Sequence, residues 1–427
     1  MDITINPGDG QLRHLFERNI PLDDIQLEER VRGIINEVRT NGDEALRRFA
    51  MQFDKADLDN IEVDQSRLKE SLEKVDREVL DAMRAAVSNI ESFHRAQLVD
   101  PIEVETLPGV TCVQRQVPIP KVGLYIPGGR APLFSTVLML AVPARLAGCR
   151  EIVLCTPAGP GGHIADEILA AAALCKVDRV FAIGGAQAIA AMAYGTETVP
   201  RVNKIFGPGN RYVTKAKQLV SITTAIDMPA GPSEVMVIAD DRANPAYVAA
   251  DLLSQAEHGP DSQSVLLCLS EEFARTVKDN VEHLSRQLHR AECIENSLAK
   301  SHIIVLPDVK AMVDAANKYA PEHLIISTEN AQDVSRFTTE AGSVFVGDYA
   351  PESAGDYASG TNHTLPTGGW AVALSGVNTD SFMRRVTYQT LTRSGLASLA
   401  PVITTMARAE GLDAHALAVT IRTENDR

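Results

Sequence analysis

Residues 227–260 read DMPAGPSEVMVIADDRANPAYVAADLLSQAEHGP, and this segment joins an apolar strand to a capped helix. The short run at 234–239 is rich in β-branched residues, which is typical of a buried strand. Asn244 followed by Pro245 predicts the start of a helix, because Asn caps helices and Pro suits their first position. The closing Gly-Pro pair predicts the end of the same helix.

Gln255 and His258 lie at the end of this expected helix. They are three residues apart, so they share one helical face and point the same way. Two interpretations remain open at this point. The pair can bind a metal ion, although a neutral amide oxygen is a weaker ligand than a carboxylate, or it can be the solvated end of a capped helix.

Strands and helices alternate on both sides of this segment. The expected strands are residues 122–126, 151–155, 179–183, 204–206, 234–239, 265–269, 302–306, 323–326 and 343–346. Helices are expected to begin near Ser135, His163, Ala186, Asn210, Pro245, Glu271, Val309 and Ala331. Such alternation indicates βαβ units on parallel sheets, and its restart near Asp227 indicates two similar halves.

We therefore expect an α/β fold of two similar, incomplete Rossmann-like parallel-sheet domains, one inserted in the other. Amphipathic helices are expected at 22–49 and 66–95, followed by extended or hairpin structure at 101–117, and helix from Ser381 to the end. The expected domains are an N-terminal extension (1–20), a discontinuous α/β domain (21–124 and 233–377), an inserted α/β domain (125–232) and a C-terminal helical tail (378–427).

Composition narrows the class of protein. The chain has 427 residues, which is enough for two to four domains of about 100–200 residues each. Its formal net charge of −15 argues against nucleic acid or an anionic membrane as the main partner. The six cysteines show no CxxC spacing, the start of the chain lacks the features of a signal peptide, and the longest apolar stretch, 137–142, is too short to span a bilayer. We therefore expect a cytoplasmic enzyme.

Glycine-rich turns follow the strands of the first half. Parallel sheets place ligands beyond the carboxyl ends of their strands, and free amides at helix N-termini favour anions. Each turn alone is more often a plain tight turn, and none has the GxGxxG dinucleotide pattern with a later acidic residue. Four of them around one edge nevertheless favour a ligand that carries phosphate. They are residues 127–130, 157–162, 184–187 and 207–210.

Four of the ten histidines stand in polar or glycine-rich surroundings that packing does not explain, namely His258, His323, His363 and His415. Glu322-His323, directly after a proline, is suited to general base chemistry, although such a dipeptide is more often a solvated surface pair. The glycine-flanked carboxylates of 351–357 could complete a metal site or belong to an ordinary turn.

Several long motifs in the same order resemble the histidinol dehydrogenase family over nearly the whole chain. They are IFGPGN (205–210), GPSE (231–234), DLLSQAEHGP (251–260), PEHL (321–324) and ESAGDYASGTNH (352–363). The resemblance implies NAD-dependent, four-electron oxidation of L-histidinol to L-histidine through enzyme-held L-histidinaldehyde, the last step of histidine biosynthesis. It also implies one zinc ion per subunit that orients the substrate, and a homodimer with shared active sites.

The family's functional residues can be carried over position by position. Zinc ligands would be Gln255, His258, Asp356 and, from the tail of the partner subunit, His415. Catalytic bases would be His323, for the hydroxyl proton, and Glu322, for water. Substrate contacts would be Ser233, Gln255, His258, His323, Asp356, His363, Glu410 and His415. Cofactor contacts would be Tyr125, Gln187 and Asn210 in the inserted domain.

Two other functions compete with this interpretation. A zinc hydrolase would use the same metal and Glu322 without a cofactor, but the chain-wide motifs and the glycine turns argue against it. An α/β ligand-binding protein without catalysis would explain the turns, but it leaves His258, Asp356 and His415 without a role.

Overall fold

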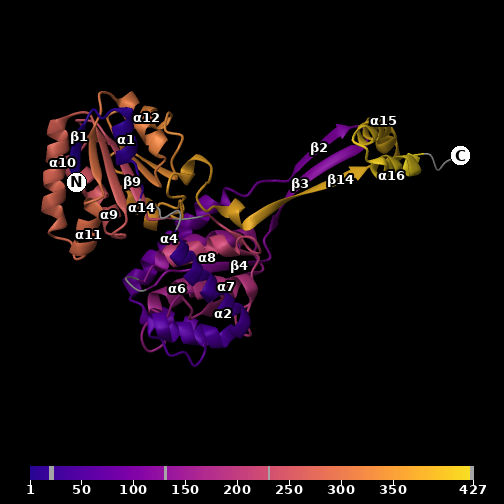
Figure 1. Cartoon of the computed structure of the whole chain (residues 1–427), viewed down its shortest axis with the longest axis horizontal. Coiled ribbons are helices and arrows are strands. Elements are labelled where there is room, and N and C mark those ends of the chain that lie inside the picture. Colours follow the sequence, from indigo (N-terminus) through magenta and orange to yellow (C-terminus); the bar gives the residue numbers. More distant parts are fainter. Residues whose placement is uncertain (19–23, 129–131, 229–230, 424–427) are drawn as a thin grey trace.

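The structure is a computed structural model that describes residues 1–18, 24–128, 132–228 and 231–423. Figure 1 shows two lobes and a long arm that projects from them and carries the C-terminal helices. The first lobe contains a five-stranded parallel sheet, the second contains a six-stranded parallel sheet, and the arm contains a three-stranded antiparallel sheet. Within the described parts of the chain, no helix is long and apolar enough to cross a membrane.

The first lobe is built on the strand order β6-β5-β4-β7-β8. Its strands are short and apolar, as expected where helices cover both faces of a parallel sheet. The strands are β4 (Lys121–Tyr125), β5 (Glu151–Cys155), β6 (Arg179–Phe181), β7 (Lys204–Phe206) and β8 (Ala225–Ile226). Its helices are α2 (Ile25–Phe49), α3 (Gln65–Lys74), α4 (Arg77–Arg95), α5 (Phe134–Ala147), α6 (Asp166–Leu174), α7 (Gly185–Tyr194) and α8 (Arg211–Val220), with a π-helical turn at Ala50–Asp54.

The second lobe has the strand order β1-β11-β10-β9-β12-β13. Its strands are β1 (Asp2–Ile5), β9 (Glu234–Ala239), β10 (Gln263–Cys268), β11 (His302–Val305), β12 (His323–Ser327) and β13 (Ser343–Val346). Alternate residues of β9 enter two separate cores: Val235 and Val237 pack with α9 (Pro245–Ala256), α10 (Glu271–Ser285) and α11 (Ala291–Leu298). Met236 and Ile238 pack with α1 (Asp9–Leu15), α12 (Val309–Tyr319) and α13 (Ala331–Ser335). The sheet is therefore buried on both faces.

The two sheets share one topology. When the strands of each lobe are numbered from β4 and from β9, both sheets have the order third, second, first, fourth, fifth. The Rossmann fold has the strand order 3-2-1-4-5-6. Each sheet therefore matches a Rossmann sheet that lacks its last strand. The strand β1 extends the second sheet beside β11, so the first lobe is inserted between β1 and β9. The expected pair of similar α/β domains, one inserted in the other, is confirmed.

The boundaries of the domains need a correction. Residues 21–124 were expected in the domain of the second sheet, but side chains such as Leu46 and Ile90 pack in one core with Leu124 of β4, in the first lobe. An amphipathic pattern shows that one face of a helix is buried, not which sheet covers it. The expected extension at 1–20 contributes β1 to the second sheet, and its boundary at 20/21 lies outside the described residues.

The arm also differs from expectation. Its sheet joins β2 (Ile102–Leu107) and β3 (Val110–Pro118) to β14 (Met383–Leu391), and α15 (Arg393–Ala409) and α16 (Asp413–Thr423) follow at its tip. The tail was expected to be helical from Ser381, but β14 is a strand that pairs antiparallel with β3 over its whole length. Its partner is distant in sequence, so no local pattern could reveal the pairing.

Smaller differences follow from local chemistry. The expected helix 66–95 is two helices, because Val75 and Asp76 are extended and the Asp76 side chain caps α4 by accepting a hydrogen bond from the Glu78 amide. The segment expected as a loop at 351–357 contains a short helix, α14 (Glu352–Tyr357). Single 3₁₀ turns occur at Trp370–Val372 and Thr379–Phe382.

Candidate active site

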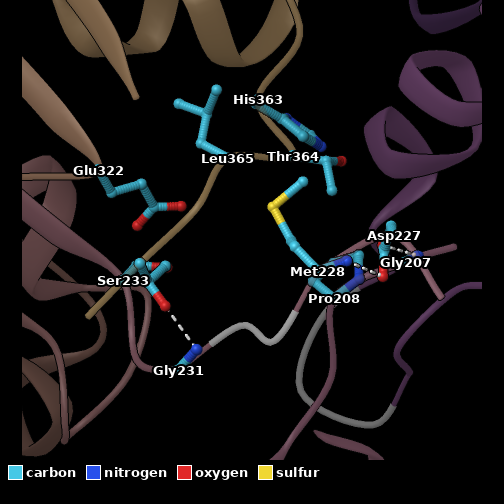
Figure 2. A pocket seen from close by; sticks show the side chains of 11 residues that line it. Gly207, Pro208, Asp227, Met228, Gly231, Ser233, Glu322, His363, Thr364 and Leu365 are labelled. Atoms are coloured by element: carbon cyan, nitrogen blue, oxygen red, sulfur yellow. Dashed lines mark hydrogen bonds between the residues drawn. The ribbon is translucent and has the colours of Figure 1, made fainter. Parts of the chain in front are cut away.

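The carboxyl end of the first sheet and the amino end of the second sheet meet at one pocket. Ser233 and Glu322 directly precede β9 and β12, so the second lobe contributes the amino ends of two paired strands. Gly207 and Pro208 follow β7, so the first lobe contributes a carboxyl end. Figure 2 shows Ser233 and Glu322 on one side of the pocket, opposite Gly207, Pro208 and Asp227. The remaining lining residues are Met228, Gly231, His363, Thr364, Leu365 and Thr367.

Glu322 is buried at this pocket and held by one backbone group. Its Oε2 accepts a hydrogen bond of 2.9 Å from the amide of Glu234, the first residue of the neighbouring strand β9. Burial raises the pKa of Glu322 well above its ordinary value, and although the amide of Glu234 opposes this rise, the carboxylates of Glu234 and Asp356 add to it. A group in this environment can hold or accept a proton near neutral pH.

His323 is the first residue of β12 and is also buried. Its Nδ1 lies 3.4 Å from Glu352 Oε1, and its Nε2 lies 3.7 Å from Asp356 Oδ1. Neither ring nitrogen has a hydrogen-bond partner among the residues that the structure describes. Burial, with a smaller contribution from His258, lowers the pKa of His323 to about 3. The imidazole is therefore neutral and has a free lone pair for a proton.

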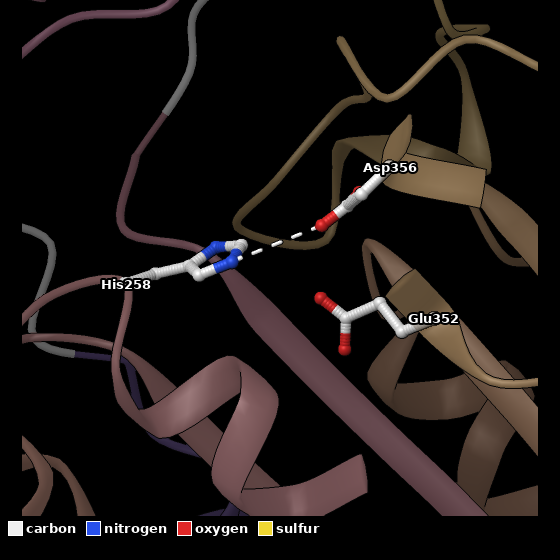
Figure 3. Close-up of side chains that lie close together, drawn as sticks. All are labelled: His258, Glu352 and Asp356. Carbon is white, nitrogen blue, oxygen red and sulfur yellow. Dashed lines mark ion pairs between the residues drawn. The ribbon is translucent and has the colours of Figure 1, made fainter. Parts of the chain in front are cut away.

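His258, Glu352 and Asp356 form a compact cluster (Figure 3), and both carboxylates of the cluster also face the ring of His323. One ligand atom from each of the three residues lies within 4.8 Å of the others. His258 Nε2 is 3.8 Å from Asp356 Oδ2. Glu352 and Asp356 lie four residues apart on α14, which places both carboxylates on the same helical face. Burial raises the pKa of Asp356 to about 7 and that of Glu352 well above its ordinary value.

The cluster fits a divalent cation. Gln255, in the last turn of α9 just before His258, is fully buried, and neither atom of its side-chain amide has a partner within the described chain. The same holds for both carboxylate oxygens of Glu352. Each unpaired buried polar group costs about 1–3 kcal/mol, and a bound cation removes that cost for its ligands. A nitrogen and oxygen donor set with carboxylate suits zinc.

His363 joins the pocket to the cluster. Its Nδ1 lies 2.9 Å from the backbone carbonyl of Asp356, and burial lowers its pKa to about 4. The preceding residue, Asn362, donates a hydrogen bond of 2.6 Å to the carbonyl of Met139 in α5 of the first lobe. The loop that carries His363 therefore spans both lobes.

Glu410 and His415 are not brought to this cluster within one chain. Glu410 follows α15 and His415 lies on α16, at the tip of the arm (Figure 1). Both side chains are exposed. The arm also exposes large apolar side chains, including Met406 and Leu417, each 60% exposed.

The cofactor candidates gather at the carboxyl edge of the first sheet. Tyr125 ends β4, and its hydroxyl accepts a hydrogen bond of 3.1 Å from the amide of Gly185. Gln187 is buried in the first turn of α7. Asn210 caps α8, since its side-chain oxygen accepts hydrogen bonds from two amides of the first turn.

One glycine draws the turn at 207–210 against β4. Gly207 has φ +123°, and a Cβ atom there would lie 2.1 Å from the carbonyl oxygen of Tyr125. The close approach holds the turn at 207–210 against the carboxyl end of β4, a position that only a residue without a side chain can occupy. Of the expected turn at 127–130, residues 129 and 130 lie outside the described residues.

Three residues of this site were not among those named from the sequence. Glu352 lies in the segment 351–357, which was noted for its carboxylates but was expected to be a loop. In a loop, the four-residue spacing to Asp356 does not place the two side chains on the same face. Arg18 and Glu234 are paired across 216 residues, and no local signal reveals that contact.

A family model described as histidinol dehydrogenase matches residues 18–423. A histidinol dehydrogenase of Bacteroides fragilis is 53% identical over 428 residues, covering 100% of both chains. One from Escherichia coli is 53% identical over 395 residues, covering 92% of this chain and 90% of that protein. The crystal structure of histidinol dehydrogenase from Elizabethkingia anophelis matches with a TM-score of 0.96 at 46% identity, covering 99% of this chain and 98% of that one.

Proposed function

The chain belongs to the histidinol dehydrogenase family, and from this premise we propose that it oxidises L-histidinol to L-histidine in two NAD-dependent steps. L-Histidinaldehyde would remain in the pocket between the steps, and the reaction would be the last of histidine biosynthesis. The observation that carries the proposal is the buried group of Glu322, His323, Glu352 and Asp356, of which Glu322 lines a pocket that also borders the carboxyl end of the first sheet.

Zinc would be held by Gln255, His258 and Asp356, with His415 of a second copy as the fourth ligand. The unpaired amide of Gln255 and the facing atoms of His258 and Asp356 support this assignment. When bound, zinc would fix the imidazole and amine of the substrate and polarise its hydroxyl. Glu352 is close enough to the same atoms to contribute its negative charge.

His323 would act in the first step. Its neutral imidazole can take the proton of the substrate hydroxyl as the carbon loses hydride to NAD. Asp356 and Glu352 lie at its two ring nitrogens and would stabilise the imidazolium that forms. Ser233 and His363, at the rims of the pocket, and Glu410 of a second copy would contact the polar groups of the substrate.

Glu322 would act in the second step. It would take a proton from the water that attacks the aldehyde, and the hydrate would then lose hydride to a second NAD. Its position at the pocket and the hydrogen bond from the Glu234 amide, which orients the carboxylate, support this role. Retention of the aldehyde would prevent its reaction with other amines.

NAD would lie on the first lobe. Tyr125, Gln187 and Asn210 surround the ends of β4, β6 and β7, and the helices α7 and α8 begin at the same edge. Amides at those helix N-termini suit the pyrophosphate group. The nicotinamide ring would then lie on the side of the pocket opposite Glu322.

A homodimer would complete each site. The arm projects from the lobes, carries both Glu410 and His415, and exposes apolar side chains that a second copy would cover (Figure 1). Exchange of arms would bring His415 of one copy to the cluster of the other.

The test is the number of NADH formed for each L-histidinol consumed to completion, with and without a chelator. We expect two NADH, loss of activity with the chelator and recovery with zinc. One NADH would mean that the aldehyde escapes and that Glu322 has another role. No NADH from zinc-loaded protein would favour a hydrolase instead.

A further inference from the structure

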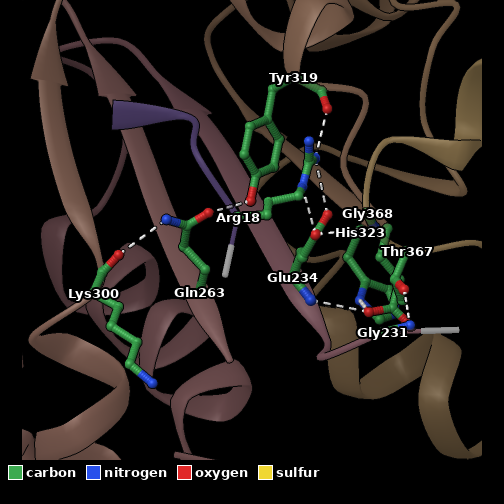
Figure 4. Close-up of polar contacts among 10 residues, drawn as sticks. Arg18, Gly231, Glu234, Gln263, Lys300, Tyr319, His323, Thr367 and Gly368 are labelled. Carbon is green, nitrogen blue, oxygen red and sulfur yellow. Dashed lines mark hydrogen bonds and ion pairs between the residues drawn. The ribbon is translucent and has the colours of Figure 1, made fainter. Parts of the chain in front are cut away.

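Behind the pocket, Arg18 forms a buried ion pair with Glu234 (Figure 4). Its Nε donates to Glu234 Oε1 at 2.6 Å, and its Nη2 donates to Oε2 at 3.0 Å. The two side chains are only 16% and 4% exposed. A buried ion pair adds little net stability, because the loss of hydration offsets the attraction. Net stability therefore does not explain why this ion pair is present in the second lobe.

The first link from this pair to the pocket runs through Glu234. Its amide donates the 2.9 Å hydrogen bond to Glu322 Oε2, while its carboxylate is held by Arg18. The carboxylate also accepts a hydrogen bond of 3.0 Å from the amide of Gly368, whose neighbour Thr367 lines the pocket. A fixed Glu234 side chain therefore fixes the donor that orients Glu322.

The second link runs through Tyr319. Nη2 of Arg18 donates a hydrogen bond of 2.6 Å to the Tyr319 carbonyl, and the guanidinium lies 3.8 Å from the centre of the Tyr319 ring. The ring is held in turn by a 2.6 Å hydrogen bond from its hydroxyl to Gln263. The next residue, Ala320, has φ +52°, an uncommon conformation for a residue with a side chain. Arg18 thus fixes the backbone at Tyr319, just before the strained turn at Ala320 that leads to Glu322.

We propose that Arg18 is a positioning residue for Glu322. One guanidinium group holds both the residue that donates to the Glu322 carboxylate and the turn that carries it. It also neutralises the Glu234 carboxylate, so that Glu322 faces a paired negative charge rather than a free one. This inference rests on the proposed function and deepens it, because it assigns Arg18 to the step that uses Glu322.

The two steps can be separated by starting from the same substrate, L-histidinaldehyde. With NAD, the hydrated aldehyde loses hydride to the cofactor and protons to Glu322 and solvent, and it becomes the carboxylate. With NADH, the aldehyde gains hydride and a proton from His323, and it becomes L-histidinol. Only the oxidation would use Glu322. The ratio of the two rates therefore reports on that residue in each variant.

The experiment compares Arg18→Met with Arg179→Met. Arg179 makes a similar two-bond pair with Glu62 in the first lobe, at 2.7 and 2.6 Å, and it is the matched control. We expect Arg18→Met to slow aldehyde oxidation by about 10- to 100-fold and aldehyde reduction by less than about threefold. Zinc content should stay at the wild-type level, and the double variant Arg18→Met/Glu234→Gln should regain part of the oxidation rate.

Equal slowing of oxidation and reduction would overturn the inference, as would an effect no larger than that of Arg179→Met. Arg18→Lys keeps the charge but not the two-pronged geometry, so it should fall between wild type and Arg18→Met. If Arg18→Met does not fold, Arg18→Lys carries the same comparison of rates. If the wild-type protein oxidises neither L-histidinol nor its aldehyde, the proposed function fails first and this inference falls with it.

Discussion

His323 Nδ1 lies 3.4 Å from Glu352 Oε1, and both groups are buried without a hydrogen-bond partner in the described chain. The imidazole thus faces a carboxylate that can balance the charge it gains when it accepts a proton. In the metal-free chain, two buried polar groups without partners lower the stability of the fold.

Glu352→Gln should therefore separate activity from stability. Removing the negative charge should lower kcat for L-histidinol by about 10-fold or more, because the imidazolium of His323 loses a stabilising neighbour. At a pH high enough to ionise the Glu352 carboxyl group, the metal-free variant should be more stable than metal-free wild type by about 1 kcal/mol, since a neutral amide costs less to bury than an unpaired carboxylate. Steady-state rates and thermal unfolding after chelation measure both effects. A variant with lower stability and unchanged kcat would contradict the role assigned to Glu352.

Asp356 should make the stability of the metal-free protein depend on pH with a definite sign. Burial raises the pKa of Asp356 from 3.8 to about 7, so the folded chain retains a proton that the unfolded chain has already lost. The contribution of Asp356 to stability should fall as pH rises from about 4 to about 7, by on the order of 2–4 kcal/mol, whereas His323 and His363, whose pKa values burial lowers to about 3 and about 4, contribute in the opposite direction. Urea unfolding of chelated wild type and of chelated Asp356→Asn at pH 5 and pH 7.5 isolates the contribution of Asp356, because both proteins keep the histidines. Zinc should raise stability more at pH 7.5, because its binding displaces the proton. A stability of wild type, relative to Asp356→Asn, that rises over this range would disprove the assignment.

Complementation should reveal whether sites are shared between chains. His415→Ala and Gln255→Ala should each lose metal and activity when expressed alone. When the two are co-expressed and assemble at random, half of the dimers are mixed and each has one intact site, so about a quarter of wild-type activity should return. His283→Ala, on the exposed face of α10, is the control and should keep full activity. An absence of recovery, with mixed dimers present, would show that His415 serves its own chain.

Gly207→Ala should weaken cofactor binding. A methyl group at φ +123° would meet the Tyr125 carbonyl at 2.1 Å, so the turn must move away from β4. We expect a rise in KM for NAD of about 10-fold and a loss of stability of about 1–3 kcal/mol. The KM for L-histidinol should change much less, since the second lobe is untouched. Gly8→Ala, where an added methyl group meets nothing within 4 Å, is the control. An unchanged KM for NAD would place the cofactor elsewhere.

Much of the fold could be predicted because its information is local. Runs such as Val235 to Ile238 are apolar along their whole length, which identifies strands buried on both faces. Asn244 and Pro245 mark the start of α9 as expected, and the Asn244 side chain accepts a hydrogen bond from the first turn. The family resemblance found from the motifs is likewise confirmed by the comparisons.

What the sequence did not reveal depends on contacts between distant segments. The pairing of β14 with β3 and the packing of α2 on the first lobe join parts of the chain that no local pattern relates. Ligand turns were expected at the carboxyl ends of strands, and Gly207, which follows β7, does line the pocket. The sequence could not show that the amino ends of the strands in the second lobe, with Glu322 and His323, would face the same pocket.

The carboxyl end of the first sheet faces the amino end of the second sheet, and this arrangement also determines the electric field in the pocket. Helices α7 and α8 begin at the first lobe's edge, so their positive dipole ends lie on that wall. In the second lobe, α9 ends beside Gln255 and α12 ends just before Glu322. The opposite wall of the pocket therefore faces the negative ends of two helix dipoles, each equivalent to about half an elementary charge. One wall thus attracts an anion and the other a cation, before any charged side chain is counted. If a nucleotide and a metal ion bind as proposed, the backbone alone would direct them to opposite sides of the pocket.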